Sequence, residues 1–217
     1  MRSILLAILL TLAFSSQVGA QAVALRLSTL GPGLDVSMPV SERLSVRAGG
    51  SYFSYTRTAT ASDDEVDVDF DGSLKWGGLR LLTDWRPVGK GLRITGGFYY
   101  NLIEASGSGI PAEPYVMNEG ESNEKVFSTD RLGSLSAKLT YGSKINPYAG
   151  IGFGDAHNGR LVTFLVDVGV IYLGSPTVEM RGTGMIAGTA NQDARLSDGL
   201  ESFRWLPVLS LGLAIRL

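Results

Sequence analysis

The sequence predicts an all-β chain that closes as an antiparallel transmembrane β-barrel. Three observations predict this fold class. The chain starts with a short cationic and apolar leader, apolar residues then alternate with small or polar ones along most of its length, and the last alternating segment ends at the final residue. We expect eight strands, with both chain ends on the periplasmic side.

Residues 1–20 have the three parts of a cleaved secretory signal. A cationic start at Arg2 is followed by an apolar run from Ile4 to Phe14, and small residues lead to Ala20. We therefore expect cleavage before Gln21, which divides the chain into a signal peptide, 1–20, and one barrel domain, 21–217. The apolar run is shorter than the roughly 18–20 residues that a spanning helix needs.

The composition excludes several classes of function. Without Arg2, 18 of the 19 basic residues remain against 21 acidic ones, so the basic excess typical of nucleic-acid-binding proteins is absent. The chain has no cysteine, which excludes disulfides and thiolate metal sites. Its 28 glycines follow no collagen-like period, and they favour strands with bends and close packing.

Alternation of period two marks the strands. It extends over 44–52, 66–76, 79–85, 92–101, 135–141, 149–153, 162–172 and 207–217. Gly77-Gly78 separates two segments of opposite phase, so we expect a β-bulge there. A turn at Leu30-Gly31-Pro32-Gly33 would divide residues 22–40 into two short strands and bring the total to eight.

The connections alternate between short and long. Short ones are expected at 41–43, 88–91 and 155–159, and long polar loops at 58–65, 105–131 and 175–203, with a short helix over 191–203. Outer-membrane barrels have short periplasmic turns and longer external loops. This order therefore places the long loops outside the cell.

A soluble sheet would also alternate, but two observations favour an apolar face in lipid and a polar face in the lumen. Aromatic residues lie near strand ends on the apolar phase, as in interfacial girdles: Tyr52, Trp76, Trp85, Tyr100, Tyr141, Tyr172 and Trp205. The polar phase mixes both signs of charge, which predicts a lumen charge network of Arg47, Asp69, Asp71, Lys75, Arg80, Asp84, Arg93, Lys138, Asp167 and Arg216.

The last strand carries the most specific pattern. Ser210, Gly212, Ile215 and Leu217 resemble the C-terminal signal that the outer-membrane assembly machinery reads, in which a polar residue and a glycine precede two apolar residues. Members of that class usually end in Phe, so Leu217 is a departure. The alternative is a final core strand of a soluble periplasmic protein.

Four further blocks carry a wider resemblance: Thr83 to Pro87, Leu92 to Asn101, Pro147 to Gly154 and Gly174 to Val178. With them the mature chain resembles a largely uncharacterised family of Gram-negative outer-membrane β-barrel proteins, similar in plan to the OmpA/OmpX and OmpW groups. The resemblance implies an outer-membrane location and a barrel. It brings no catalytic residue with it.

Three candidate sites are weighed against simpler interpretations. His157 is the only histidine, and no serine neighbours it in sequence, so we expect no catalytic residue. The glycines at 150, 152 and 154 lack the following helix of a phosphate loop and fit the inside of a tight barrel. Acidic residues at 63–65 and between Glu113 and Asp130 have no EF-hand spacing and suit solvated loops.

The sequence therefore predicts no metal and no cofactor. We expect an outer-membrane barrel that acts as a structural or surface-interaction scaffold with extracellular loops. Its partners would be membrane lipid and lipopolysaccharide, the outer-membrane assembly machinery and an extracellular ligand, and no nucleic acid. A narrow channel for small or hydrophobic solutes is the alternative, and a barrel enzyme that modifies lipid A is a third.

Overall fold

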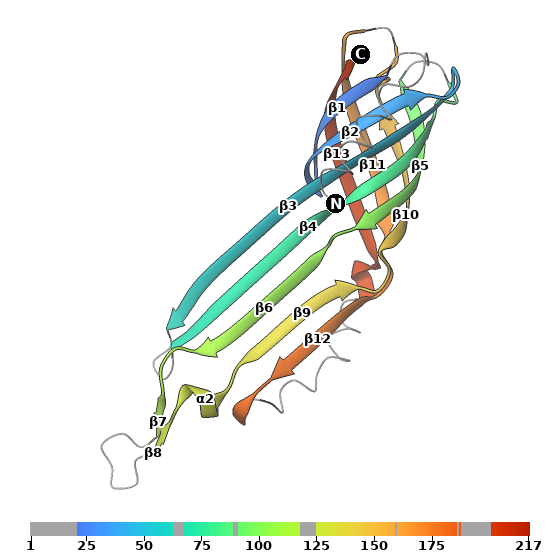
Figure 1. The fold of residues 1–217 in the computed structure, drawn as a ribbon. Coiled ribbons are helices and arrows are strands. Elements are labelled where there is room, and N and C mark those ends of the chain that lie inside the picture. Colours follow the sequence, from blue (N-terminus) through green and yellow to red (C-terminus); the bar gives the residue numbers. More distant parts are fainter. Residues whose placement is uncertain are drawn as a thin grey trace, which may run out of the picture.

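In the computed structural model the chain folds as a closed barrel from which one side continues as an open sheet (Figure 1). The structure describes residues 21–62, 67–88, 91–117, 125–158, 160–185, 187 and 201–217. The expected signal peptide lies outside these residues. No helix in the described part of the chain is long and apolar enough to cross a membrane.

Eight antiparallel strands form the ring, which confirms the predicted barrel and its strand number. In ring order they are β1 (Ala22–Ser28), β2 (Gly31–Pro39), β3 (Leu44–Ser62), β4 (Asp67–Trp85), β5 (Leu92–Asn101), β10 (Ile145–Phe153), β11 (Val162–Tyr172) and β13 (Trp205–Arg216). β13 pairs with both β11 and β1 and so closes the ring. The predicted split of residues 22–40 is present as the β1–β2 hairpin.

The open sheet, which we call the extension, has five strands and lies beyond one end of the barrel. Its strands are the far halves of β3 and β4 together with β6 (Glu104–Pro111), β9 (Leu135–Tyr141) and β12 (Pro176–Gly182). Short elements follow: β7 (Tyr115–Met117), β8 (Lys125–Phe127), the helix α2 (Thr129–Leu132) and the 3₁₀ helix η2 (Glu201–Arg204).

Much of the sequence that we expected as three polar loops is therefore sheet. Within the expected loops, 104–111 and 176–182 are rich in small residues and pair in register beyond the barrel with 135–141, which was predicted as a strand. A helix over 191–203 is found only as η2 at its end, and residues 191–200 lie outside the described part. Neighbouring strands supply the partner groups that let these short-side-chain segments remain extended.

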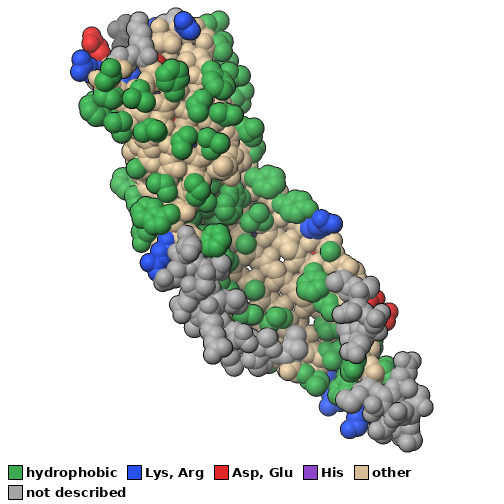
Figure 2. Space-filling view, turned by 180° about the vertical axis from the view of Figure 1, so that it is seen from behind, with side chains coloured by type: hydrophobic (Ala, Val, Ile, Leu, Met, Phe, Trp, Pro, Cys, Tyr) green, Lys and Arg blue, Asp and Glu red, His purple; other side chains and the backbone are tan. Residues whose placement is uncertain are grey.

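Large apolar side chains cover the outside of the barrel (Figure 2). They include Leu25, Leu79, Leu81, Phe98, Ile151, Phe164, Val168, Leu211 and Leu213. Such an apolar belt is stable only against lipid, and a closed barrel pairs its backbone groups there without an edge. Strands of 9 to 12 residues in β5, β10, β11 and β13 match the length needed to cross a bilayer.

Aromatic residues mark where the barrel meets the extension. Tyr52, Tyr100, Tyr172 and Trp205 are exposed there, and the rings of Tyr172 and Trp205 lie 4.6 Å apart. Two members of the predicted girdle are instead inside: Tyr141 is buried in the core, and Trp76 packs against it. Trp76 lies where β4 passes into the extension and Tyr141 lies on β9 of the extension, and in this region the apolar side chains point inward.

The β-bulge expected at Gly77-Gly78 is absent, because pairing runs without an extra residue from Leu44–Trp85 to Ser62–Asp67. On β4 the positions of Leu79 and Leu81 face lipid, and the same face continues through Lys75, Ser73 and Asp71. The phase change in the sequence is therefore a change of environment along one regular strand, from lipid to water.

Candidate functional site

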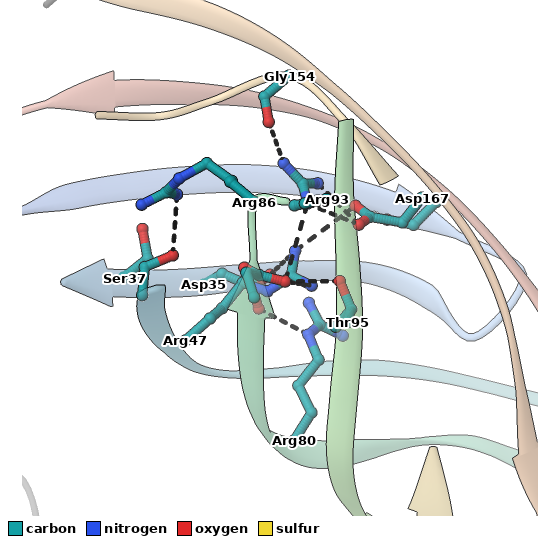
Figure 3. Close-up of polar contacts among 12 residues, drawn as sticks. Asp35, Ser37, Arg47, Arg80, Arg86, Arg93, Thr95, Gly154 and Asp167 are labelled. Atoms are coloured by element: carbon teal, nitrogen blue, oxygen red, sulfur yellow. Dashed lines mark hydrogen bonds and ion pairs between the residues drawn. The ribbon is translucent and has the colours of Figure 1, made fainter. Parts of the chain in front are cut away.

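Seven buried charged side chains fill the middle of the barrel (Figure 3). They come from six of the eight strands: Arg26 on β1, Asp35 on β2, Arg47 on β3, Arg80 and Asp84 on β4, Arg93 on β5 and Asp167 on β11. We call them the Arg–Asp cluster. Each alternates with lipid-facing apolar neighbours on its strand, which is why the sequence turns it inward.

Two carboxylates form most of the short contacts in the cluster. Asp35 Oδ1 accepts a hydrogen bond from Arg80 Nε at 2.6 Å, and Asp35 Oδ2 forms an ion pair with Arg26 Nε, also at 2.6 Å. Asp167 pairs with Arg93 Nη2 at 2.7 Å and also with Arg26. Strands that are not neighbours in the ring, such as β2 and β4 or β5 and β11, are thereby joined through its interior.

Arg47 lies between these pairs. Its Nη2 is 3.3 Å from Asp84 Oδ1 and its Nη1 is 3.5 Å from Asp167 Oδ2. Thr95 donates its hydroxyl to Asp84 at 2.6 Å, and Arg93 also donates to the carbonyl of Gly154. Because nearly every carboxylate oxygen is shared, removing one member would leave a buried charge without its partner.

Glycines make room for the cluster. A Cβ atom at Gly49 would collide with Asp35 Oδ1, and one at Gly152 with Asp167 Oδ1 and Arg93 Nε. Gly150 and Gly169 leave space in the same way for the Tyr148 hydroxyl. The glycines that the sequence placed inside a tight barrel thus shape its interior.

The interior is sealed above the cluster. Tyr99 and Tyr148 lie with ring centroids 5.2 Å apart, and the buried Leu30, Ile103, Ile171 and Leu173 pack beyond them toward the extension. The cavity among Arg26, Arg47, Arg80 and the two tyrosines is only about 10 Å³. It is about the size of one water molecule, so the described side chains fill the barrel at this level.

A second polar group closes the opposite end, where the short turns lie. Asp155 accepts the His157 backbone N–H at 3.0 Å and Arg86 Nη1 at 3.3 Å. The His157 side chain first, and then this backbone N–H and Arg86, lower the pKa of Asp155 to about 2. Arg86 also donates to Ser45 at 3.2 Å. The group fastens the β10–β11 turn to the barrel wall.

The structure places the hydroxyl of Ser37, on β2, beside His157, which the sequence did not predict. Its Oγ is 3.5 Å from His157 Nε2, while His157 Nδ1 is 3.7 Å from Asp155 Oδ1. Both distances exceed the 2.6–3.2 Å typical of a nucleophile and its base. The side chains of His157 and Asp155 are largely buried, so the arrangement suits packing better than attack on a substrate.

The predicted lumen network separates into two places. Arg47, Arg80, Asp84, Arg93 and Asp167 come together in the barrel. Asp69, Asp71, Lys75 and Lys138 lie on the extension, where Lys75 Nζ and Lys138 Nζ contact Glu104 at 3.2 and 3.0 Å. On β4, Asp69, Asp71 and Lys75 lie on the face opposite to Arg80 and Asp84, because the strand runs without a bulge, and these parts of β4 and β9 lie beyond the barrel.

Arg216, also predicted for the lumen network, is half-buried at the end of β13 and forms no ion pair with a described residue.

Sequence reasoning missed Arg26 and Asp35, two central members of the cluster. Their signal was present: Val23, Leu25 and Leu27 alternate with Ala22, Ala24 and Arg26, and Leu34 and Val36 flank Asp35. Once the two short strands are phased, both charges fall on the inward face.

The terminal pattern divides between the two faces of β13. Ser210 is buried and accepts Arg26 Nη1 at 3.3 Å, and Gly212 leaves room for the Arg26 side chain. Ile215 and Leu217 are exposed. That these four residues are read during assembly stays a prediction.

One face of the extension is polar and continues the lipid-facing side of the barrel. Neighbouring positions along the paired strands include Thr56, Thr58, Asp69, Asp71, Ser73, Lys75, Glu104, Ser106, Ser108, Ser136, Lys138, Glu179 and Arg181. Thr58 and Thr60 donate to Asp71 and Asp69 at 2.6 and 2.7 Å. A hollow of about 570 Å³ lies on this face.

The opposite face continues the barrel interior and is apolar. Gly72, Gly107 and Ala137 are paired neighbours on β4, β6 and β9 and form its low floor. Val68, Phe70 and Leu135 stand beside them, and together they line a groove of about 670 Å³ with Arg57 at one side. We call this the apolar groove.

No described group of three His, Cys, Asp or Glu side chains is arranged to hold a metal ion. Of the acidic positions considered in the sequence, 63–65 and 119–124 lie outside the described residues.

No protein-family model matches the chain, and no curated protein matches it. Two of the solved structures that share its fold come from one organism. CarO2 of Acinetobacter baumannii is 17% identical with a TM-score of 0.58, covering 93% of this chain and all of that one. CarO of the same organism is 18% identical with a TM-score of 0.56, covering 93% of this chain and 99% of that one. With its apolar belt, the chain is therefore an eight-stranded β-barrel of the outer-membrane type.

Proposed function

We propose that the protein is a non-catalytic outer-membrane scaffold that displays the extension as an interaction surface outside the cell. The observation that carries this is the contrast between a filled barrel and a large open sheet. The barrel interior leaves a void of about 10 Å³, whereas the extension presents hollows of about 570 and 670 Å³ on its two faces.

The orientation rests on the connections. The three short turns at 40–43, 86–91 and 154–161 share one end of the barrel with both ends of the described chain, where Leu217 N–H donates to the Gln21 carbonyl at 2.8 Å. Short turns are periplasmic in outer-membrane barrels. The extension would then face the exterior, above the lipopolysaccharide layer that surrounds the belt.

The apolar groove is the binding surface that we assign. Its floor of two glycines and an alanine leaves backbone accessible between apolar walls, which is how extended or ring-shaped ligands approach a sheet. A Cβ at Gly107 would meet only the Asp71 carbonyl, at 3.8 Å, so a larger side chain fits without moving the sheet. Gly107→Leu should therefore fill the groove and keep the fold.

Adhesion of intact cells tests this role. Cells that express the protein should attach to polystyrene or immobilised casein more than cells without it, and Gly107→Leu should remove most of the gain. Ser106→Ala, on the opposite face of β6, is the matched control and should keep it. Equal adhesion by wild-type and Gly107→Leu cells would reject the groove as the binding surface.

A channel would require an open path through the barrel. Purified protein in planar bilayers should show no steady conductance, because the Arg–Asp cluster and the layer from Leu30 to Leu173 close the lumen. Reproducible single-channel steps that disappear with heat unfolding would favour the channel instead.

A further inference from the structure

We propose that the small cavity inside the barrel binds one monovalent anion of the size of chloride. The cavity lies beside the Arg–Asp cluster, lined by Arg26, Arg47, Arg80, Tyr99 and Tyr148 among others. Three independent features lead to this assignment: an unbalanced charge, unused hydrogen-bond donors and the size of the void.

The charges of the cluster do not cancel. Four guanidinium groups, Arg26, Arg47, Arg80 and Arg93, face three carboxylates, Asp35, Asp84 and Asp167, and each is at most 6% exposed. The second polar group is balanced, since Arg86 is paired with Asp155. The described interior therefore holds one excess positive charge inside a ring of lipid, where an unpaired charge is costly.

Donors without acceptors surround the void. Arg26 Nη2, Arg47 Nε and Arg80 Nη2 are buried and have no hydrogen-bond partner among the described residues. The tyrosine hydroxyls and those of Ser28 and Ser210 belong to the same lining, and Asp167 is its only carboxylate. A water molecule could accept two of these donors, but it would leave the excess charge in place.

The size of the cavity selects the ion. A void of about 10 Å³ admits a particle near the size of water, which suits a halide after small side-chain shifts and rejects sulfate, phosphate and carboxylates. A single negative charge also brings the cluster to neutrality. Leu82 and Val208 close the apolar side of the lining, so the ion would be dehydrated and held by the donors.

Bromide replaces chloride and can be located directly. Crystals of the detergent-solubilised protein grown in sodium bromide should show an anomalous peak between Arg26, Arg80 and Tyr148. In solution the unfolding temperature should rise with chloride concentration and then saturate, whereas gluconate at equal ionic strength should give no such rise. A cavity without an anomalous peak, or equal unfolding temperatures in both salts, would overturn the proposal.

Variants separate this site from general salt effects. Arg80→Gln removes the excess charge, and Asp35 keeps Arg26 as a partner, so the chloride dependence should disappear. Lys138→Gln removes an exposed cation on the extension and should leave that dependence unchanged. If Arg80→Gln does not refold, Tyr148→Phe should move the chloride response to higher concentration. The same loss in Lys138→Gln would contradict a barrel site.

Discussion

The barrel and the extension are built from the same strands, yet they point their apolar side chains in opposite directions. Along β4, Leu79, Leu81 and Trp85 cover the lipid-facing side, and the continuation of that side carries Asp71 and Lys75. Solvent explains the reversal, because lipid surrounds one half and water the other. The phase of an alternating pattern therefore reports the environment of a strand, and its reversal marks the membrane boundary.

Glycine also has a different role in each region. In the barrel, a side chain at Gly49 or Gly152 would collide with members of the Arg–Asp cluster, so these glycines permit a filled interior. In the extension, a Cβ at Gly72 or Gly107 would meet only a neighbouring carbonyl at 3.7 or 3.8 Å, so the missing side chains leave a groove. The barrel uses missing side chains to close a lumen, and the extension uses them to open a surface.

The largest loss of stability should follow from breaking the Arg–Asp cluster. Asp167→Asn leaves Arg26, Arg47 and Arg93 without a shared carboxylate, and uncompensated buried charge costs about 3–5 kcal/mol. Urea unfolding of the refolded protein in detergent measures this. Asp71→Asn, an exposed carboxylate on the extension, is the control. Equal unfolding midpoints for both variants would show that the cluster does not hold the barrel.

The next largest effect should distinguish the lipid-facing part of β4 from its water-facing part, which lie on the same face of the strand. Leu81→Arg places a cation in lipid and should cost about 2–4 kcal/mol, while Ser73→Arg on the same face should be close to neutral in water. Folding yields into lipid vesicles, read as the heat-modifiable band on a gel, distinguish them. If Ser73→Arg impaired insertion as strongly, the membrane boundary would lie further along β4 than Tyr52 and Tyr100 indicate.

Adding a methyl group should destabilise the protein at a glycine of the barrel and not at a glycine of the extension. Gly152→Ala forces Asp167 and Arg93 apart and should destabilise the barrel by roughly 1–3 kcal/mol. A Cβ at Gly107 meets only the Asp71 carbonyl, at an ordinary contact distance of 3.8 Å, so Gly107→Ala should leave the unfolding midpoint unchanged. Tolerance of both substitutions would mean that the cluster can shift within the lumen.

The sequence predicted the closed barrel, its eight strands and the inward place of Arg47, Arg80 and Asp167 because period-two alternation is a local signal. It did not separate lumen from extension. Asp69 and Asp71 alternate as regularly as Asp84, and the bulge expected at Gly77-Gly78 put them on the same face as Asp84. The regular register of β4 places them on the opposite face, and the pairing of β4 with β6 places them outside the ring.

The extension was missed for a related reason. Residues 104–111 and 176–182 have small side chains and few large apolar ones, so nothing local marked them as strands. They become sheet by pairing with neighbours far away in sequence, as in Glu179 opposite Lys138. The contact of Ser37 with His157 escaped for the same reason, since it spans 120 positions.

Acid should weaken the turn end of the barrel in a defined range. His157 and Arg86 lower the pKa of Asp155 from 3.8 to about 2, so its contribution is complete above 3.8 and is lost as the pH falls toward 2. After screening by solvent we expect roughly 1 kcal/mol. Asp155→Asn should flatten this part of the stability profile measured by urea unfolding. An unchanged acid slope would assign the loss to other carboxylates.

The smallest effect should come from the ion pairs of the extension. Hydrogen bonds from Lys138 and then Lys75 lower the pKa of Glu104 below its usual 4.5. Its contribution is therefore present above that pH and fades as the carboxylate is protonated. Because these groups are exposed, Glu104→Gln should lower the free energy of unfolding by less than about 1 kcal/mol, and by less still in high salt.

Amide hydrogen exchange measures this effect. Exchange on β6 and β9 should become slightly faster in Glu104→Gln at neutral pH, while Glu179→Gln, whose pair with Arg181 is longer at 3.9 Å, should leave it unchanged. Faster exchange in the barrel strands would mean that the two regions unfold together, and the division between a rigid barrel and a separately held sheet would then fail.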